Sequence, residues 1–207
     1  MAGRFISFEG GEGVGKSTQI ARVADALRGT GLTVIITREP GGTSDAEAIR
    51  SLLMSGEADR WNDPTEALLF AAARADHVAK RIRPALARGE WVLCDRFVDS
   101  TRAYQGGAGG LPDDDIMALH RIGSGGLLPD RTLVLDLPVG EGASRVSARA
   151  SDEPDRMGTK RAAYYQRVVD FFRDLAVREP ERVRLVDVSG PVDAVTERLM
   201  AALADLQ

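Results

Sequence analysis

The chain has 207 residues, of which 43% are hydrophobic and 28% charged, a balance that excludes wholesale disorder or a fibrous repeat. Its formal net charge of −4 at pH 7 gives no general attraction to nucleic acid or acidic lipid. No apolar run approaches the roughly 20 residues of a membrane helix, and the first residues have the pattern of a strand rather than a leader peptide. Since the lone Cys94 cannot form an internal disulfide, we expect a soluble cytoplasmic protein that binds neither nucleic acid nor a membrane.

Strand-like and helix-like segments alternate along the whole chain. Short β-rich or apolar runs predict five strands, at residues 4–8, 32–37, 91–94, 132–137 and 183–188. Apolar residues at helical spacing predict helices at residues 16–28, from 44, at 64–88, 113–122, 139–149 and 160–178, and after the fifth strand. Because parallel strands need such crossover connections, we predict one α/β domain over residues 1–207, with a five-stranded parallel sheet and helices on both faces.

Several local signals sharpen this prediction. Ser44 has Glu47 three residues later, the spacing of a capping box, and Asp63 is followed by Pro64, which suits the first helical position. We therefore expect Ser44 and Asp63 to cap their helices. Residues 106–110 are rich in glycine and predict a flexible turn. His77 is expected on a helix surface, with the edge of a pocket as the alternative.

Residues 10–17 read Gly-Gly-Glu-Gly-Val-Gly-Lys-Ser and fit the pattern G-x-x-x-x-G-K-[ST], between a predicted strand and a predicted helix. The glycines let backbone N–H groups converge on phosphate oxygens, and the helix amino end adds a positive dipole. Lys16 is expected to reach the β and γ phosphates, and Ser17 to bind Mg²⁺. The sequence therefore predicts a P-loop NTPase-type fold whose ATP-binding loop consists of Gly10, Gly11, Glu12, Gly13, Val14, Gly15, Lys16, Ser17 and Thr18.

A phosphate-binding loop leaves the reaction open. A GTPase would carry an N-K-x-D motif, which the sequence lacks, and the D-x-x-G match at residues 155–158 follows no predicted strand. A motor or partitioning ATPase would need a protein partner, and a kinase of small molecules needs a second pocket. Arg38 and Arg96 each follow a predicted strand, so both should lie at the sheet edge that carries the loop. Their guanidinium groups suit a second phosphate.

At this point the chain resembles the thymidylate kinase family. The matching pieces run in family order over nearly the whole chain: residues 9–18, residues 37–43, Phe70-x-x-x-Arg74, Asp95-Arg96-Phe97, Ser100-x-x-x-Tyr104-Gln105-Gly106, Pro129-Asp130 and Asp155-Arg156. The resemblance implies transfer of the γ-phosphoryl group of ATP to thymidine monophosphate (dTMP), giving the diphosphate (dTDP) in dTTP synthesis. It also implies Mg²⁺ and a homodimer formed through helices, which the alanine-rich residues 64–88 permit.

The resemblance assigns the base and sugar contacts of dTMP. Phe70 and Arg74 share a helix face, so Phe70 would stack on thymine while Arg74 donates to a carbonyl oxygen of the base. Spacing alone would favour a core phenylalanine beside a surface arginine, and the resemblance reverses this preference. Ser100 and Gln105 would complete base recognition. Tyr104 would lie against the deoxyribose and disfavour a 2′-hydroxyl.

The resemblance also assigns the groups around the reacting phosphates. Glu12 would accept the 3′-hydroxyl of dTMP, and Arg38 and Arg96 would hold its phosphate. Asp95 would hold Mg²⁺, directly or through water, together with Ser17. Lys16, Asp95 and Arg96 are therefore counted as catalytic, because positioning and positive charge dominate phosphoryl transfer.

The remaining catalytic arginine is expected in a lid at about residues 145–158. Residues 11–14 contain no basic side chain, which resembles the bacterial subtype with a lid arginine. Arg145 and Arg149 share a helix face; Arg149 is predicted to insert between donor and acceptor, and Arg145 to bind ATP. A solvated helix face is the alternative. The lid is longer than in common members and has Gly158 where an acid often stands, so Arg145 or Arg156 could take the role.

Two other functions stay open on sequence alone. One is a deoxynucleoside kinase or another nucleoside monophosphate kinase. The other is a nucleotide sensor or ATPase that regulates a partner without phosphorylating a small molecule. An acceptor that carries a phosphate separates the first alternative from the main prediction, because Arg38 and Arg96 expect one.

Overall fold

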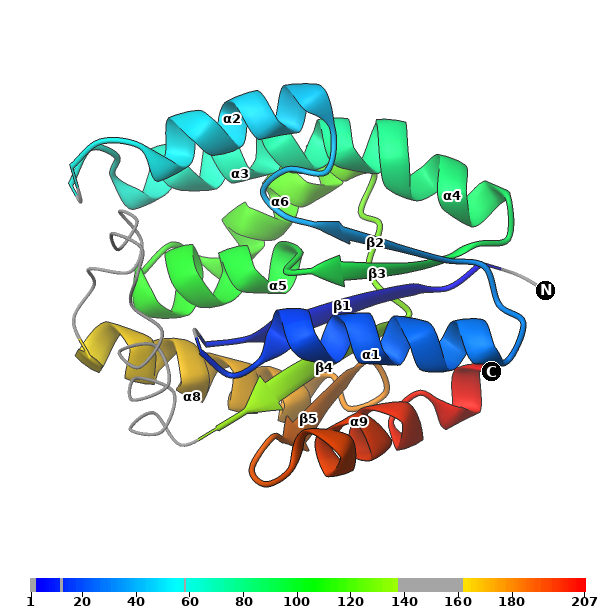
Figure 1. The fold of residues 1–207 in the computed structure, drawn as a ribbon. Helices are drawn as coiled ribbons and strands as arrows, with labels where there is room; N and C mark the ends of the chain where they lie inside the picture. Colours follow the sequence, from blue (N-terminus) through cyan, green and yellow to red (C-terminus); the bar gives the residue numbers. More distant parts are fainter. Residues whose placement is uncertain (1–2, 12, 58, 138–161) are drawn as a thin grey trace.

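A computed structural model describes the chain except for residues 1–2, 12, 58 and 138–161. Within the described residues, five parallel strands form one sheet in the order β2-β3-β1-β4-β5 (Figure 1). Their bounds are β1 (Phe5–Gly10), β2 (Val34–Arg38), β3 (Trp91–Asp95), β4 (Arg131–Asp136) and β5 (Val183–Asp187). The predicted five-stranded parallel sheet is confirmed.

Helices cover both faces of the sheet. Helices α1 (Lys16–Gly29) and α9 (Val192–Ala201) pack on one face (Figure 1). The other face carries a longer series, which consists of α3 (Asp63–His77), η1 (Val78–Ile82), α4 (Arg83–Ala87), α5 (Val98–Thr101), η2 (Arg102–Ala108), α6 (Asp113–Ser124) and α8 (Ala162–Arg178). Helix α2 (Ser44–Met54) packs on α3, and a short 3₁₀ turn, η3 (Ala204–Leu206), ends the chain.

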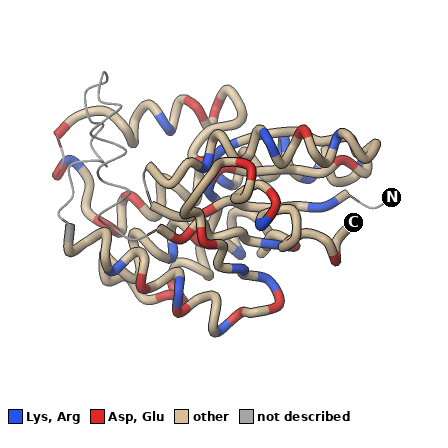
Figure 2. Tube along the Cα trace, turned by 60° about the horizontal axis from the view of Figure 1, so that its bottom comes forward, with Lys and Arg blue, Asp and Glu red and all other residues tan. Residues whose placement is uncertain are grey.

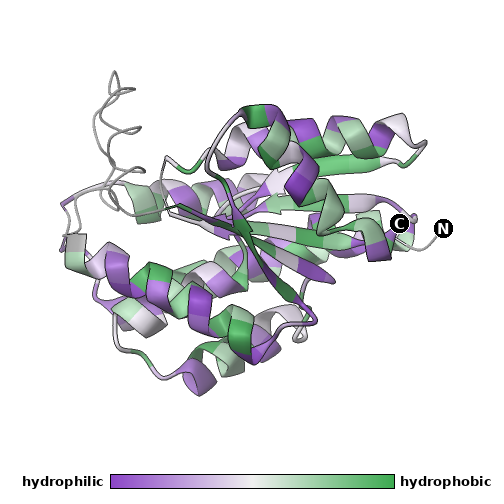
Figure 3. Ribbon diagram, turned by 90° about the horizontal axis from the view of Figure 1, so that it is seen from below, coloured by the Kyte–Doolittle hydropathy of each residue, from purple (hydrophilic) through white to green (hydrophobic). Residues whose placement is uncertain are grey.

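Successive side chains of a strand point to opposite faces of the sheet, and both faces of this sheet are covered by helices. Along β3, Trp91 and Leu93 join the core beneath α1 and α9, while Val92 and Cys94 join the core beneath η1 and α4. Strands buried on both faces need apolar residues at nearly every position, which is why they read as continuous hydrophobic runs. In Figure 3 hydrophobic residues run along the strands, whereas the helices around the sheet carry bands of both hydrophilic and hydrophobic residues. Acidic and basic residues are interspersed over the described elements (Figure 2).

The helix starts differ from the prediction by one residue. Thr43, not Ser44, caps α2 by accepting a hydrogen bond from the Ala46 N–H at 3.2 Å. Asn62, not Asp63, caps α3 by accepting from the Thr65 N–H at 2.9 Å. In both cases a suitable side chain stands one position earlier, and the extended backbone there lets its oxygen reach the first turn.

Two further predictions are corrected within the helices. The long helix predicted at residues 64–88 is α3, η1 and α4 in succession; its π-helical turn η1 lies just before Pro84, which has no N–H to continue the regular pattern. The glycine-rich turn is instead the end of η2. Position 107 has no room for a side chain, because α8 lies close to it. A Cβ there would lie 2.6 Å from a ring carbon of Phe171. The helix predicted at residues 139–149 lies outside the described residues. Among those described, no helix is long and apolar enough to span a bilayer.

Candidate active site

The phosphate-binding loop joins β1 to α1 at the carboxyl edge of the sheet. Gly10, Gly13 and Gly15 have positive φ angles of 127°, 71° and 91°, a region that favours glycine. At Gly10 a side chain is also excluded by space, because a Cβ would lie 2.6 Å from the carbonyl oxygen of Leu135. Gly15 is the N-cap of α1 and offers no side chain to its first N–H groups. The loop thus has the backbone form that anion binding requires.

The side chains of the loop have distinct surroundings. Lys16 donates from Nζ to the carbonyl oxygens of Gly10 and Gly11, at 3.2 and 2.7 Å, so it lies back across the loop. Val14 is buried in the core beneath the loop, which leaves its backbone to face a ligand. Ser17 and Thr18 are exposed. Glu12, predicted to contact both nucleotides, lies outside the described residues.

A groove beside the loop brings Ser17 and Asp95 together. Both line it, with Thr37 and Arg38 from the end of β2. The Oδ1 atom of Asp95 is buried and has no hydrogen-bond partner among the described residues. A hydroxyl and a carboxylate are oxygen ligands that Mg²⁺ accepts, and a cation would satisfy the buried oxygen. These two residues therefore fit a divalent metal.

A second pocket lies beyond this groove. It brings together six of the residues predicted to bind dTMP, namely Phe70, Arg74, Arg96, Ser100, Tyr104 and Gln105. Arg38 is the exception, because it lines the groove instead and pairs with Glu47 at 3.1 Å. The pocket thus gathers side chains from α3, α5, η2 and the turn after β3.

Several pocket residues were missed by sequence reasoning. Arg50 and Met54 of α2 line the pocket, and Arg50 also donates to the Pro40 carbonyl oxygen at 2.9 Å. A signal for Arg50 was available, because it stands at helical spacing from Ala46 and Leu53, which are both fully buried. A cationic side chain on the apolar face of a helix needs a polar partner or a polar site nearby.

Arg74 is buried at the base of the pocket. Its Nε donates to Glu39 at 2.7 Å, a guanidinium nitrogen donates to Thr101 at 2.8 Å, and the group lies over the ring of Phe97. The alternative of a surface arginine is therefore wrong. Phe70, half-buried on the pocket wall, is not a core residue either.

His77 is fully buried, so its predicted surface position is wrong. Its Nδ1 contacts the second carboxylate oxygen of Glu39 at 3.0 Å, and its Nε2 contacts the Thr37 hydroxyl at 2.7 Å. Both ring nitrogens thus have partners, which is the condition for burying a histidine. The polar residues Thr37 and Glu39 at the end of β2 were the available signal. Gly42 also touches this group, since a Cβ there would collide with the imidazole.

Arg96 connects the pocket to the phosphate-binding loop. Its backbone has φ 66°, a left-handed conformation that is uncommon outside glycine. One guanidinium nitrogen lies 3.1 Å from the Ser100 hydroxyl and 3.3 Å from the carbonyl oxygen of Gly10. The group also stacks on Tyr104, with Cζ 5.1 Å from the ring centre. Arg96 therefore reaches both predicted nucleotide sites.

Glu9, at the end of β1, lies beneath Arg96 and is fully buried. Its carboxylate accepts from the Phe97 N–H at 2.7 Å and from the Ser100 hydroxyl at 2.5 Å. Burial and the charge of Asp99 raise the pKa of Glu9 to about 8, against the opposing effect of Arg96. Sequence reasoning gave this residue no role, although an acid in an apolar strand before the loop was a signal.

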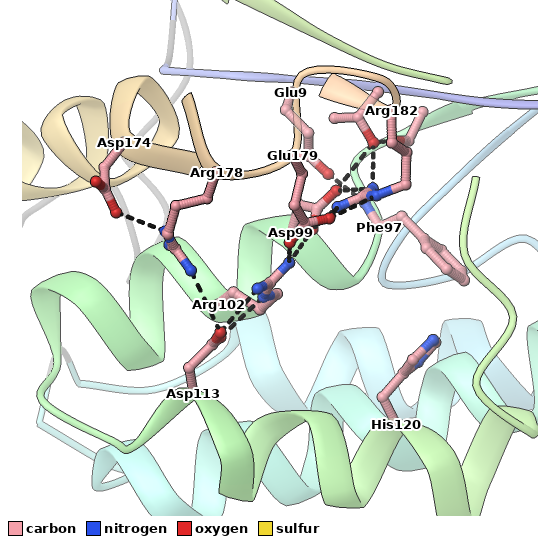
Figure 4. A network of polar contacts seen from close by, with 12 residues as sticks. Glu9, Phe97, Asp99, Arg102, Asp113, His120, Asp174, Arg178, Glu179 and Arg182 are labelled. Carbon is pink, nitrogen blue, oxygen red and sulfur yellow. Dashed lines mark hydrogen bonds and ion pairs between the residues drawn. The ribbon is translucent and has the colours of Figure 1, made fainter. Parts of the chain in front are cut away.

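A buried ionic network supports the helix that carries the pocket residues (Figure 4). Asp99 of α5 accepts from Arg182 at 2.7 Å and from Arg102 at 3.1 Å. Arg102 also binds Asp113 and Glu179, so α5, η2, α6 and the turn before β5 are joined. Burial would raise the pKa of Asp99, but the two arginines hold it below its usual value. The network fixes the chain on either side of Ser100.

Comparisons with known proteins agree with this geometry. The thymidylate kinase family model matches residues 8–199. A thymidylate kinase of Rhizorhabdus wittichii is 58% identical over 206 residues, which cover 100% of this chain and 99% of the relative. One of Caulobacter vibrioides is 52% identical, over 99% and 95% of the two chains. A crystal structure of thymidylate kinase from Ehrlichia chaffeensis has a TM-score of 0.76 at 32% identity and covers 98% and 99%.

The chain belongs to the thymidylate kinase family. The predictions of the family, of a P-loop NTPase-type fold and of phosphoryl transfer from ATP to dTMP are confirmed. Use of ATP as donor follows from thymidylate kinase membership, generally with a divalent metal. Arg145, Arg149 and the rest of the predicted lid, like Glu12, lie outside the described residues, so their roles stay predictions.

Proposed function

We propose that this thymidylate kinase binds ATP on the phosphate-binding loop and dTMP in the pocket beyond Arg96, and that Arg96 joins the two sites. The observation that carries this assignment is the position of the Arg96 guanidinium. It lies between the Ser100 hydroxyl of the pocket and the Gly10 carbonyl oxygen of the loop. A phosphate at this place would be held by a cation in reach of both nucleotides.

On the donor side, the backbone of residues 10–15 and the amino end of α1 would hold the phosphates of ATP. Lys16 would leave its two loop carbonyls to reach the β and γ phosphates. Ser17 and Asp95 would hold Mg²⁺, which supplies positive charge to the transferring phosphoryl group. Two protein ligands suffice for this ion, because Mg²⁺ usually takes the rest of its oxygen ligands from phosphates and water.

On the acceptor side, we propose that Phe70 stacks on thymine and that Arg74 donates to a carbonyl oxygen of the base. Ser100 and Gln105 complete the recognition of the base, and Tyr104 lies beside the sugar. Their common location in one pocket supports these roles. The phosphate of dTMP is held by Arg96 and by Arg38, which would first exchange its exposed pairing with Glu47 for the ligand.

Three roles rest on residues outside those described. Glu12 is proposed to accept the 3′-hydroxyl, Arg149 to insert at the transferring phosphoryl group, and Arg145 to contact ATP. A mobile arginine is worth about 10³–10⁵ in rate in related phosphoryl transfers. Removing Arg149 should therefore lower kcat far more than it weakens binding of either nucleotide.

The activity is tested by incubating the purified chain with ATP, Mg²⁺ and dTMP, and by measuring ADP and dTDP. We expect ADP formation that depends on dTMP and is absent with thymidine. Lys16→Ala should abolish turnover and leave the circular dichroism spectrum unchanged. Equal turnover of thymidine would favour a deoxynucleoside kinase, and ATP consumption that ignores dTMP would favour a regulatory ATPase.

We also propose a homodimer, since α2, α3 and α6 pack together and each carries an exposed apolar side chain, Leu52, Leu68 and Ile122. A cytoplasmic location stays a prediction from the sequence.

A further inference from the structure

One of the two arginines proposed to hold the phosphate of dTMP is already paired with an acid. The Nη2 atom of Arg38 lies 3.2 and 3.1 Å from the two carboxylate oxygens of Glu47. Among the described residues, the Arg38 side chain has no other hydrogen-bond partner. The other arginine, Arg96, donates to the neutral oxygens of Ser100 and Gly10. A carboxylate therefore occupies one of the two guanidinium groups that the acceptor phosphate would use.

Glu47 lies in a turn that is suited to an anion. It belongs to the first turn of α2, and its Oε1 accepts from the Gly42 N–H at 3.1 Å as well as from Arg38. Gly41 leaves room for it, because a Cβ there would collide with the Glu47 carboxylate. The Gly42 N–H, Arg38 and the charge of Arg50 hold the pKa of Glu47 below its usual value, against the effect of burial. Glu47 is therefore ionised at neutral pH.

The pair of Arg38 and Glu47 lies where the acceptor phosphate is proposed to bind. Both residues line the groove that also contains Ser17 and Asp95, the two residues that fit a divalent metal. Their side chains are partly open to solvent, with exposed fractions of 55% and 40%. An ion pair this exposed changes an equilibrium by about fivefold at most. A phosphate monoester, with about −1.5 to −2 charges at pH 7, can therefore displace the carboxylate.

The atom that Glu47 contacts indicates which effect it has on Arg38. Glu39 holds Arg74 through Nε, at 2.7 Å, and so leaves the terminal nitrogens of that guanidinium clear of the acid. Both oxygens of Glu47 instead lie at Nη2, a terminal nitrogen of Arg38. Terminal guanidinium nitrogens are the donors that reach a phosphate at the end of the side chain. Glu47 thus competes with a phosphate for Arg38.

We propose that Glu47 is a positioning residue that sets the affinity for dTMP, because its carboxylate holds Arg38 in place of the acceptor phosphate and must be displaced when dTMP binds. This rests on the proposed function, in which Arg38 holds that phosphate. The affinity for dTMP is then reduced by the fraction of molecules in which Arg38 is free of Glu47. Thymidine has no phosphate, so its affinity does not depend on the pair.

The test compares the dissociation constants of dTMP and thymidine in Glu47→Gln. The constant of dTMP is measured by calorimetry and that of thymidine by its competition with dTMP. Glutamine keeps an amide oxygen for the Gly42 N–H but has no charge to hold Arg38. We expect the dTMP constant to fall about threefold and the thymidine constant to stay the same. The ratio of the thymidine constant to the dTMP constant therefore rises about threefold.

Asp45→Asn is the matched control. Asp45 lies in the same first turn of α2 and pairs with Lys80, so this variant removes an equal charge without touching Arg38. Its ratio should equal that of the unmodified chain. Arg38→Ala should weaken dTMP and leave thymidine unchanged. Glu47→Gln added to Arg38→Ala should then give little further change, because no guanidinium remains to be released.

Each outcome decides the proposal. An unchanged ratio in Glu47→Gln, or a lower ratio because dTMP binds more weakly, would overturn it. A gain that persists in full without Arg38, or appears equally in Asp45→Asn, would come from general charge repulsion and would also overturn it. If Glu47→Gln does not fold, Glu47→Ala removes the competing carboxylate outright, and the same rise of the ratio is expected.

Arg38→Ala also separates this proposal from the proposed function. An unchanged affinity for dTMP in that variant would overturn the phosphate role of Arg38 and, with it, the competition by Glu47. Failure of the unmodified chain to form dTDP from ATP and dTMP would contradict the proposed function instead.

Discussion

At the scale of single residues, the site depends on charges that are buried and individually paired. Glu39 joins Arg74 and His77 through its two carboxylate oxygens, and all three side chains are almost fully buried. Removing one partner of such a group leaves a charge without water or counter-charge. The same pairing that holds Arg74 in the pocket proposed for dTMP is therefore also part of what stabilises the fold.

Glu39→Ala should lower the free energy of unfolding by about 3–5 kcal/mol, the usual effect of breaking a buried ion pair. Asp25→Ala provides the matched control, because Asp25 pairs with Arg28 on the exposed face of α1. Its expected effect is below about 1 kcal/mol. Urea unfolding followed by circular dichroism measures both. Similar losses in the two variants would mean that the Glu39 group is not a stabilising pair.

His120 should make stability depend on pH. Burial lowers its pKa to about 4, and its Nε2 lies 2.8 Å from the Leu127 carbonyl oxygen. The unfolded chain then binds a proton more readily than the folded one, so the free energy of unfolding falls as the pH drops from about 6.5 to about 4. The loss is roughly 3 kcal/mol. His120→Gln should remove this part of the slope in urea titrations at several pH values; an unchanged slope would refute the assignment.

At the scale of elements, the pocket proposed for dTMP depends on how closely η2 approaches α8. Tyr164 of α8 donates to the carbonyl oxygen of Tyr104 at 2.6 Å, and Gly107 lies against Phe171. Tyr104 and Gln105 belong to the same turn of η2. Any displacement of η2 from α8 would therefore move two proposed contacts of dTMP.

Gly107→Ala should separate these two elements. The added Cβ would lie 2.6–2.9 Å from Phe171, so we expect a loss of about 1–3 kcal/mol in stability and a higher KM for dTMP. Gly29→Ala, near the end of α1, is the control, because nothing lies within 4 Å of its added Cβ. That variant should be neutral or slightly stabilised. Thermal unfolding and steady-state kinetics are measured for both variants. An unaltered KM for dTMP in Gly107→Ala would contradict the dependence of the pocket on the approach of η2 to α8.

At the scale of the whole molecule, the sequence predicted the features that local patterns determine. The alternation of apolar runs predicted the parallel sheet, and the spacing of Gly10, Gly15 and Lys16 predicted the loop and its place. The buried positions and contacts of Glu9 and His77 were not predicted, because their partners are distant in the chain. These partners are Ser100 for Glu9, and Glu39 and Thr37 for His77. Spacing within one segment carries no information on such contacts. The resemblance to a family supplied the pocket residues but not the acids that hold them.

The arrangement of α2, α3 and α6 leads to a prediction about assembly. Leu68 and Ile122 are 55% and 83% exposed on helices that pack against each other, where Gly123 lets α6 approach Ala71 and Ala75 of α3. If these helices form the interface of a homodimer, a charge in it would be desolvated without a partner. Leu68→Glu should therefore shift the chain from dimer to monomer in sedimentation equilibrium.

Val177→Glu is the matched control for this shift, since Val177 is 79% exposed on α8, which is not one of the three helices. It should leave the dimer intact, so that the effect of Leu68→Glu reports position rather than added charge. A monomeric unmodified chain would exclude the dimer altogether. Dissociation by Val177→Glu alone would instead place the interface on α8, beside the elements that form the pocket proposed for dTMP.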